Sequence, residues 1–334
     1  MRILPLESSS EDKASTLSED HAPRSVSTSP EDLQTFSRRI VSELLARSGI
    51  TPAPFPPPHF TTVDTLVRET LRTWDMGGIP PARVEEKTAF GLLFGTACYA
   101  HAHPDTQVLM ALLIFCAACI DDGDVPAGAQ AAFTARLLAG RAQAHPVLDG
   151  LVGVLARAPD VLNAYSAAVV AADTVNFVNS TRFEGLLGEM RLSGAAGLYP
   201  TYKRHKNGLN EVTAGTVWDK FAFPDVATHI QAIPDATLFI MYTNDVISFY
   251  KEELAGETEN FVHDVAHVTG QDPRVVVQEL ADKAVACIHN VRDILEGEKE
   301  REAWESFLAG YLCLHLTAPR YHMGRLLGDE VQRT

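Results

Sequence analysis

The clearest pattern along the chain is a helical spacing of apolar side chains, which recurs from residue 31 almost to the C-terminus. In residues 31–47 and again in residues 61–74, apolar positions return every three or four residues, as in amphipathic helices. A Gly- and Pro-rich break follows at 76–81. Alternation with a period of two, which would indicate strands, does not extend over any useful length. We therefore predict an all-α fold in a single domain over residues 31–334.

Two of the later predicted helices are apolar almost all round, as expected of helices buried in a core. One contains the uninterrupted apolar run 108–120, which is shorter than the ~18–20 residues needed to span a bilayer. The other leads into the segment 244–252. After the break, helices are predicted over residues 83–102, 105–120, 127–140, 147–156, 161–190, 199–220, 236–254, 260–269, 273–296 and 301–317.

Two segments are expected to lack helices. Residues 1–30 are rich in Ser, Asp and Glu and contain no apolar stretch long enough for a secretory signal, which predicts a disordered tail. Residues 51–58 are Pro-rich and should form a stiff extended connector within the helical domain. Together these features predict a soluble, cytoplasmic protein without a transmembrane segment.

Composition narrows the class of protein further. The chain has 334 residues, of which 46% are apolar, enough for one large core or two modest ones. Its net charge of −15 argues against nucleic acid as a partner. The five cysteines lie in apolar helical contexts, which predicts buried free thiols. Cys116 and Cys119 form a Cys-x-x-Cys inside such a helix without a partner pair, so a zinc or redox role is not favoured.

A polar stripe interrupts the second apolar helix. Asn244, Ser248 and Glu252 lie four residues apart and fall within ~80° of one another on an α-helix. Lys251 lies at the edge of the same stripe. Amide, hydroxyl and carboxylate oxygens suit a hard divalent cation such as Mg²⁺, and a neighbouring lysine suits a phosphate. The alternative is that the stripe marks where a core helix reaches solvent.

A second cluster of oxygens, Asp121, Asp122 and Asp124, follows the first apolar helix, which Gly123 and Pro126 bring to an end. Carboxylates are unfavourable there, because the helix dipole is negative at its C-terminus and because like charges repel. A solvated turn tolerates such a cluster, whereas a bound cation would make it favourable.

The string Asn-Asp-Val-Ile-Ser-Phe-Tyr-Lys-Glu at residues 244–252 resembles the second metal-binding motif of class I terpene synthases, Asn/Asp-Asp-x-x-Ser-x-x-x-Glu. It is most similar to the version found in the fungal trichodiene synthase family, and the resemblance covers most of the chain after about Phe36. It implies a helical bundle with a central active-site cavity and an isoprenyl diphosphate as ligand. It also implies Mg²⁺ as cofactor, with Mn²⁺ as a substitute, and is compatible with a homodimer. Asn244, Ser248 and Glu252 would be metal ligands.

The family carries an Asp-rich motif on the opposite lip of its pocket, at a separation similar to the 123 residues between Asp121 and Asn244. By this resemblance Asp121 is also a metal ligand. Val125 stands where the family usually has a second acid, and the sequence leaves open whether Asp124 compensates for it.

The resemblance also implies residues that bind the diphosphate. Arg204 would sense it, and Asn207 and Gly208 would be the linker and the kink residue that transmit pocket closure; the alternative is a solvated basic turn. The further residues expected to contact the diphosphate are Lys251, Arg320 and Tyr321.

The implied activity is that of a sesquiterpene synthase, which ionises and cyclises farnesyl diphosphate to a hydrocarbon or alcohol and releases diphosphate. Two alternatives remain. A chain-elongating prenyltransferase of the same fold would normally show two Asp-rich motifs, and a non-catalytic helical scaffold protein would not need to retain Asn244, Ser248 and Glu252. The aromatic side chains available to stabilise carbocations, none of which is assigned that role, are Phe90, Phe94, Phe115, Trp218 and Tyr242.

Overall fold

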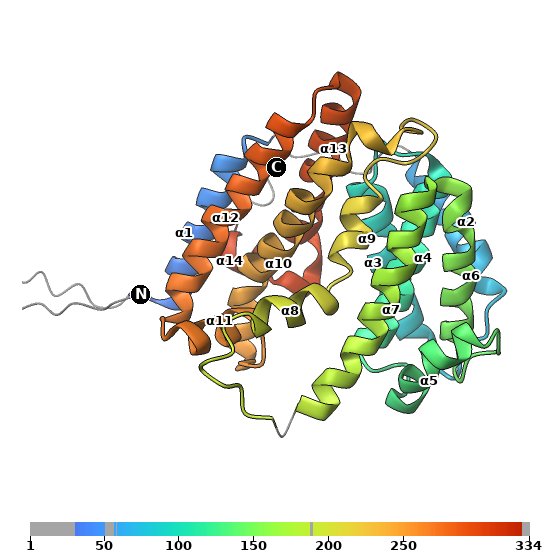
Figure 1. Cartoon of the computed structure of the whole chain (residues 1–334), viewed down its shortest axis with the longest axis horizontal. Coiled ribbons are helices and arrows are strands. Elements are labelled where there is room, and N and C mark those ends of the chain that lie inside the picture. The colour runs from blue at the N-terminus through green and yellow to red at the C-terminus, as the bar shows by residue number, and fades with distance from the viewer. Residues whose placement is uncertain (1–30, 51–56, 58, 188–189, 329–334) are drawn as a thin grey trace, which may run out of the picture. The chain divides into compact units, whose positions relative to one another are not determined.

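The computed structural model describes residues 31–50, 57, 59–187 and 190–328. The predicted disordered tail and all but Pro57 of the Pro-rich connector lie outside these residues. A compact unit begins at Leu33, and every regular element in its described part is a helix (Figure 1). The all-α prediction is therefore confirmed.

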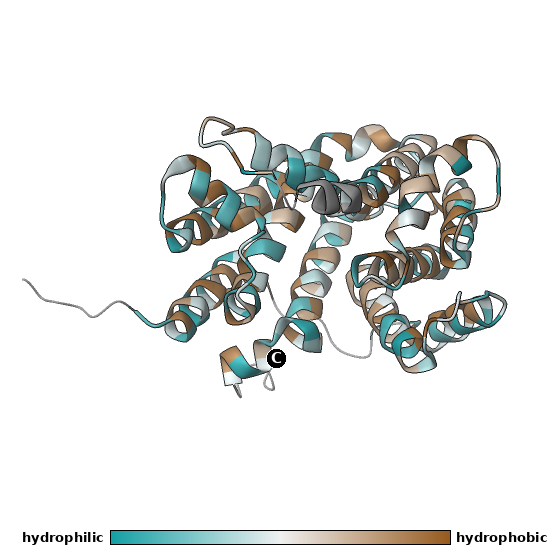
Figure 2. Cartoon of the chain, turned by 90° about the horizontal axis from the view of Figure 1, so that it is seen from below, coloured by the Kyte–Doolittle hydropathy of each residue, from teal (hydrophilic) through white to brown (hydrophobic). Residues whose placement is uncertain are grey.

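Helix bounds follow the sequence pattern closely, because most helices have one apolar face to bury (Figure 2). Short 3₁₀ turns are η1 (Val226–Thr228), η2 (Ile230–Ala232) and η3 (Pro319–Tyr321). The α-helices in the described residues are α1 (Leu33–Ser48), α2 (Phe60–Arg72), α3 (Pro81–Cys98), α4 (Pro104–Asp121), α5 (Ala127–Leu138), α6 (Pro146–Val161), α7 (Ala164–Leu187), α8 (Tyr199–Lys206), α9 (Asn210–Gly215), α10 (Ile233–Ala255), α11 (Phe261–Thr269), α12 (Pro273–Ile294), α13 (Glu298–Thr317) and α14 (Met323–Leu327).

The structure corrects the prediction of one long helix over residues 199–220. The chain forms two short helices there, α8 and α9, separated by Asn207, Gly208 and Leu209. Leu209 has a φ of +48°, in the left-handed region that a continuous α-helix excludes. The apolar pattern continues across the break because Leu209 and Val212 are both buried in the same core.

Two smaller corrections concern α6 and one cysteine. Helix α6 runs through Pro159 to Val161, whereas the pattern predicted an end at residue 156. All five cysteines are free thiols, but Cys313 is only partly buried.

Helix α4 lies in the core, packed against α2, α3 and α6. It is long and apolar enough to cross a membrane by length and composition alone, but 78% of it is buried inside the protein, as in a core helix. Its side chains from Thr106 to Cys116 are all buried. The prediction of a buried core helix is confirmed, and it sets Asp121 at the helix C-terminus.

Two glycines of α3 allow its backbone to touch that of α4. A Cβ atom on Gly91 would lie 2.5 Å from the carbonyl oxygen of Ala111, and one on Gly95 would lie 2.5 Å from that of Gln107. These distances are too short for a side chain, so the spacing of the two helices depends on glycine at both positions.

We expect Gly95→Ala to lower the free energy of unfolding by about 1–3 kcal/mol, because the added methyl group forces α3 away from α4. Gly153→Ala in α6 is the matched control, since no atom lies within 4 Å of its added Cβ. That variant should be as stable as the wild type or more stable, by up to about 1 kcal/mol. Urea unfolding measures both, and equal stability of the two variants would contradict the proposed backbone contact.

Candidate active site

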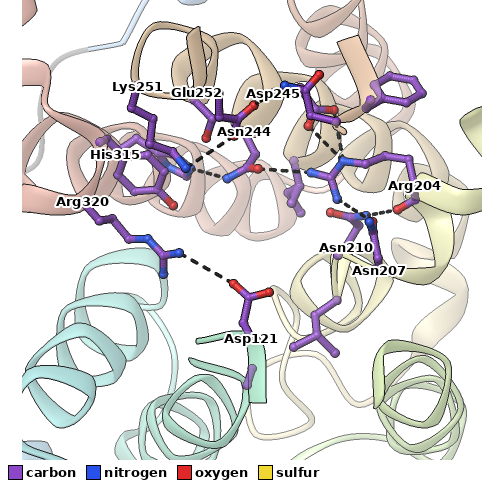
Figure 3. A pocket seen from close by; sticks show the side chains of 18 of the residues that line it. Asp121, Arg204, Asn207, Asn210, Asn244, Asp245, Lys251, Glu252, His315 and Arg320 are labelled. Carbon is purple, nitrogen blue, oxygen red and sulfur yellow. Dashed lines mark hydrogen bonds and ion pairs between the residues drawn. The ribbon is translucent and has the colours of Figure 1, made fainter. Parts of the chain in front are cut away.

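A cavity of about 780 Å³ is bounded by residues of α3, α4 and α7–α10 together with α13 and η3. Its wall is partly apolar, with Phe90, Ile114, Phe177 and Ile240 among the lining residues. The polar part is drawn in Figure 3. The structure brings all ten residues singled out in the sequence to this one cavity: Asp121, Arg204, Asn207, Gly208, Asn244, Ser248, Lys251, Glu252, Arg320 and Tyr321.

The stripe on α10 faces the cavity, and most of the remaining residues of that helix up to Tyr250 are buried in the core. Ser248 is 3% exposed. The Glu252 carboxylate accepts a hydrogen bond from Asn260 Nδ2 at 3.0 Å and lies 3.4 Å from Lys251 Nζ. Asn244, Ser248 and Glu252 therefore present three side-chain oxygens along one helix face, as the spacing predicted.

Arg204 lies beside this row, held by three acceptors (Figure 3). Its Nε donates to both carboxylate oxygens of Asp245, at 2.9 and 3.1 Å. Its Nη2 donates to Asn244 Oδ1 at 3.2 Å, and its Nη1 donates to Asn207 Oδ1 at 3.3 Å. Burial raises the pKa of Asp245 to about 6, although the Arg204 charge opposes this. The pair is thus a buried salt bridge next to the cavity.

The break between α8 and α9 contacts the same arginine. Besides the bond from Arg204 to Asn207, Asn210 Nδ2 donates to the Arg204 backbone carbonyl at 3.3 Å. A Cβ on Gly208 would collide with the side chains of Arg204 and Asn210. Glycine is therefore needed at position 208 for the close approach of the Arg204 and Asn210 side chains to the backbone. A movement of Arg204 would change the contacts of the α8–α9 break.

Asp121 ends α4 on the other side of the cavity from Asn244 and Glu252 (Figure 3). Its Oδ2 lies 3.8 Å from Arg320 Nη2. The side chain is 56% exposed, and that surface is open to the cavity. Desolvation by the surrounding protein raises the pKa of Asp121, and Arg320 opposes that shift.

The other two aspartates of the turn point to α3. Lys87 Nζ lies 2.9 Å from Asp122 Oδ2 and 3.1 Å from Asp124 Oδ2, and Arg83 Nε lies 2.7 Å from Asp124 Oδ1. Val125 is 1% exposed. Asp124 therefore belongs to an ion-pair cluster with α3 and does not replace the acid that is missing at Val125. Asp121 is the one aspartate of this turn that lines the cavity.

Arg320 and Tyr321 form the 3₁₀ turn after α13. The Arg320 guanidinium lies 4.8 Å from the centre of the Phe90 ring, a cation–π contact that holds the charge at the cavity wall. Tyr321 is buried, and this raises the pKa of its phenol to about 12. Its ring lies 4.4 Å from that of His315, whose pKa burial lowers to about 4. At neutral pH the phenol is thus a hydrogen-bond donor and the imidazole is uncharged.

The aromatic residues named in the sequence divide into two groups. Phe90 and Phe94 line the cavity. Phe115 and Trp218 are fully buried and pack in the core instead, and Tyr242 is not part of the lining either.

Several polar residues that the structure places at the site had no role assigned from the sequence, among them Asp245, Asn260 and His315. Asp245 had a signal, as an acid inside the string 244–252. His315 had a weaker one, as a lone polar residue in the apolar end of the predicted helix 301–317. Asn260 had none, because its contact with Glu252 depends on how the chain turns after α10.

Comparisons with known proteins agree with this fold. The linalool/nerolidol synthase of Streptomyces clavuligerus, in complex with 2-fluorogeranyl diphosphate, superposes with a TM-score of 0.59 at 17% identity, covering 81% of this chain and 98% of that one. Hedycaryol synthase in complex with nerolidol gives 0.60 at 17% identity, covering 80% and 96%. These likenesses define the fold.

The sequence relatives identify the enzyme class. The chain is 34% identical to monoterpene synthase 25 of Postia placenta over 82% of this chain and 83% of that protein. It is 31% identical to terpene synthase 29 of the same fungus, over 89% and 86%, and 26% identical to longiborneol synthase CLM1 of Gibberella zeae, over 78% and 80%. The protein is a class I terpene cyclase, a lyase that acts on an isoprenyl diphosphate.

Its family follows from a further match. The family model described as trichodiene synthase (TRI5) matches residues 72–333, which span all the site residues named above. The chain belongs to the trichodiene synthase family, as the motif at residues 244–252 had indicated.

We expect Lys87→Met to lower the free energy of unfolding by about 1–3 kcal/mol, because it leaves the buried Asp124 with Arg83 alone. Arg83→Met is the matched control: its side chain is 45% exposed, so its loss should cost less. Chemical denaturation compares the two variants, and a larger cost for Arg83→Met would contradict the buried lysine as the centre of the cluster.

Proposed function

We propose that the enzyme is a sesquiterpene synthase, which ionises farnesyl diphosphate with the help of Mg²⁺, cyclises the hydrocarbon chain and releases diphosphate. The observation that carries this proposal is the convergence on one partly apolar cavity of side-chain oxygens from two sides and of cationic side chains between them. Oxygens suit the metal ion, cations suit the diphosphate, and apolar wall suits the hydrocarbon chain.

The donor set fits a hard divalent cation. Asp121 from α4 and Asn244, Ser248 and Glu252 from α10 offer only oxygen, and two of the four are carboxylates. Mg²⁺ prefers such ligands, and Mn²⁺ accepts them as a substitute. A bound cation would supply Lewis-acid polarisation of the leaving diphosphate.

The chain's own residues would bind the leaving group and protect the cation. Arg204, Lys251 and Arg320 would donate charge-assisted hydrogen bonds to the diphosphate, and the protonated Tyr321 phenol would add another. The carbon–oxygen bond breaks, and diphosphate leaves with the electron pair. The apolar wall would shield the allylic cation from early reaction with water. Loss of a proton from the cyclised cation would yield a hydrocarbon, and addition of water followed by loss of a proton would yield an alcohol.

Geranyl diphosphate is the second candidate substrate. The relative at 34% identity is named a monoterpene synthase, whereas another, at 26% identity, is named (E)-β-farnesene synthase, from Metarhizium brunneum. The two names support different chain lengths, so the substrate has to be measured.

The assay is incubation of the purified protein with MgCl₂ and, separately, geranyl, farnesyl and geranylgeranyl diphosphate, followed by gas chromatography and mass spectrometry. We expect a cyclic sesquiterpene from farnesyl diphosphate and no product when EDTA is present. In parallel reactions that also contain isopentenyl diphosphate, a longer diphosphate, detected as its alcohol after phosphatase treatment, would instead indicate a chain-elongating enzyme. Absence of turnover with every substrate would contradict the proposal.

We expect Ser248→Ala to lower kcat/KM by about 100-fold, or about 2.7 kcal/mol, because it removes one metal ligand. Raising the MgCl₂ concentration should restore part of this loss. The matched control is Ser166→Ala, another buried serine, whose hydroxyl has no hydrogen-bond partner in the described part of the chain. Steady-state kinetics should show the control unchanged; equal activity of the two variants would remove Ser248 from the metal site.

A further inference from the structure

His315 borders the cavity but is almost completely buried. It lies in the last turns of α13 and is 1% exposed. Its ring is 4.3 Å from that of Tyr311 and 4.4 Å from that of Tyr321. Both of its nitrogens have partners: Nδ1 lies 2.8 Å from the Tyr311 carbonyl oxygen, and Nε2 lies 3.3 Å from Asn244 Nδ2 (Figure 3).

Contacts run from Arg204 through Asn244 and His315 to the Tyr311 carbonyl. Because the guanidinium can only donate and the carbonyl can only accept, the direction of each hydrogen bond between them is fixed. A guanidinium can only donate, so the Asn244 atom that faces Arg204 Nη2 at 3.2 Å is the amide oxygen. The amide nitrogen, which can only donate, therefore faces His315 Nε2, and Nε2 must accept. The ring proton is then on Nδ1 and is donated to the Tyr311 carbonyl, which can only accept.

The Asn244 side chain also acts on the Tyr321 hydroxyl, whose pKa it lowers against the effect of burial. A hydroxyl can donate or accept, so it fits either orientation of the amide and does not determine which is present. Arg204 and His315 do determine it, because a flipped amide would point NH₂ at a guanidinium and oxygen at an unprotonated ring nitrogen.

We propose that His315 is a positioning residue, which accepts a hydrogen bond from Asn244 Nδ2 and so keeps Asn244 Oδ1 directed toward the metal site. This inference rests on the proposed function. When a diphosphate draws the donors of Arg204 to itself, His315 is the remaining group that fixes the amide orientation. A freely rotating Asn244 would present nitrogen as well as oxygen to the cation, and nitrogen of an amide does not ligate Mg²⁺.

Two other roles for His315 make different predictions. As a packing group, its ring between two tyrosines would matter and its nitrogen would not. As a general base, its Nε2 would have to face the substrate, whereas Asn244 occupies that nitrogen. A pair of variants separates ring from acceptor: His315→Phe keeps a ring and has no acceptor, and His315→Gln places an acceptor near the position of Nε2 and has no ring.

The first measurement is calorimetric titration of inorganic pyrophosphate into the full-length protein at a series of MgCl₂ concentrations. We expect His315→Phe to weaken the Mg²⁺-dependent binding by about 10–100-fold, as is usual for loss of a group that orients a ligand. His315→Gln should lie closer to the wild type. The reverse order, with Phe tolerated and Gln impaired, would assign His315 to packing and overturn the proposal.

A double-mutant cycle with Asn244→Asp adds a second criterion. Aspartate has no N–H to donate to His315, so adding His315→Phe to that variant should weaken binding much less than it does in the wild type. Fully additive losses would overturn the proposal.

A third measurement needs no folded Phe variant. In ¹⁵N NMR spectra of histidine-labelled wild-type protein, the His315 signals, assigned by their loss in His315→Gln, should show a protonated Nδ1 and an unprotonated Nε2. A protonated Nε2 would overturn the assignment of donor and acceptor.

Wild-type controls separate this inference from the proposed function. If the wild type binds Mg²⁺ and pyrophosphate but does not turn over farnesyl diphosphate, the substrate proposal fails and the binding tests of His315 still decide its role. If the wild type does not bind pyrophosphate in a Mg²⁺-dependent way, both proposals fail together.

Discussion

The polar side chains around the cavity lie next to apolar helices, so each needs a hydrogen-bond or ion-pair partner to offset its lost hydration. Arg204 meets this need with three acceptors, among them the carboxylate of Asp245. Outside the cavity lining, the buried Lys87 meets the same need with Asp122 and Asp124. These mutual contacts determine which oxygens are left to face the cavity. In the proposed reaction, the metal ion and the diphosphate would replace existing contacts, such as those of Arg204 with Asn244 and of Arg320 with Asp121.

The sequence predicted what depends on local periodicity, and the family resemblance predicted which distant motifs meet at one cavity. Neither predicted the individual contacts between side chains of distant segments. Asn244, Ser248 and Glu252 share a face because the helical period places them there. The resemblance named Gly208 as a kink, but one helix was still predicted to continue to residue 220. A buried apolar residue such as Leu209 gives the same sequence pattern in a helix and in a left-handed turn. The contact between His315 and Asn244 joins residues 71 positions apart, and no pattern along the chain encodes such a distance.

The turn after α4 places only one of its three aspartates at the cavity. Val125 packs in the core where a second acid would be usual, and Asp124 is paired with α3. Asp121 is thus the sole aspartate of the turn that lines the cavity, opposite three oxygens on α10. Burial and the neighbouring charge of Asp122 raise the pKa of Asp121, whereas Arg320, 3.8 Å away, opposes that shift. The α4 side of the site therefore offers one candidate metal ligand, and the α10 side offers three.

Arg204 connects the two elements that pocket closure would have to move together. Its guanidinium contacts α10 through Asp245 and Asn244, and it contacts the α8–α9 break through Asn207. In the proposed complex, a diphosphate would compete with all three acceptors for the same donors, and its higher charge would give it the stronger hydrogen bonds. If Arg204 turns toward the diphosphate, the Asn207 contact must lengthen or the break must follow. A Cβ on Gly208 would collide with the side chains of Arg204 and Asn210, so a reoriented Arg204 would act directly on the backbone at this glycine.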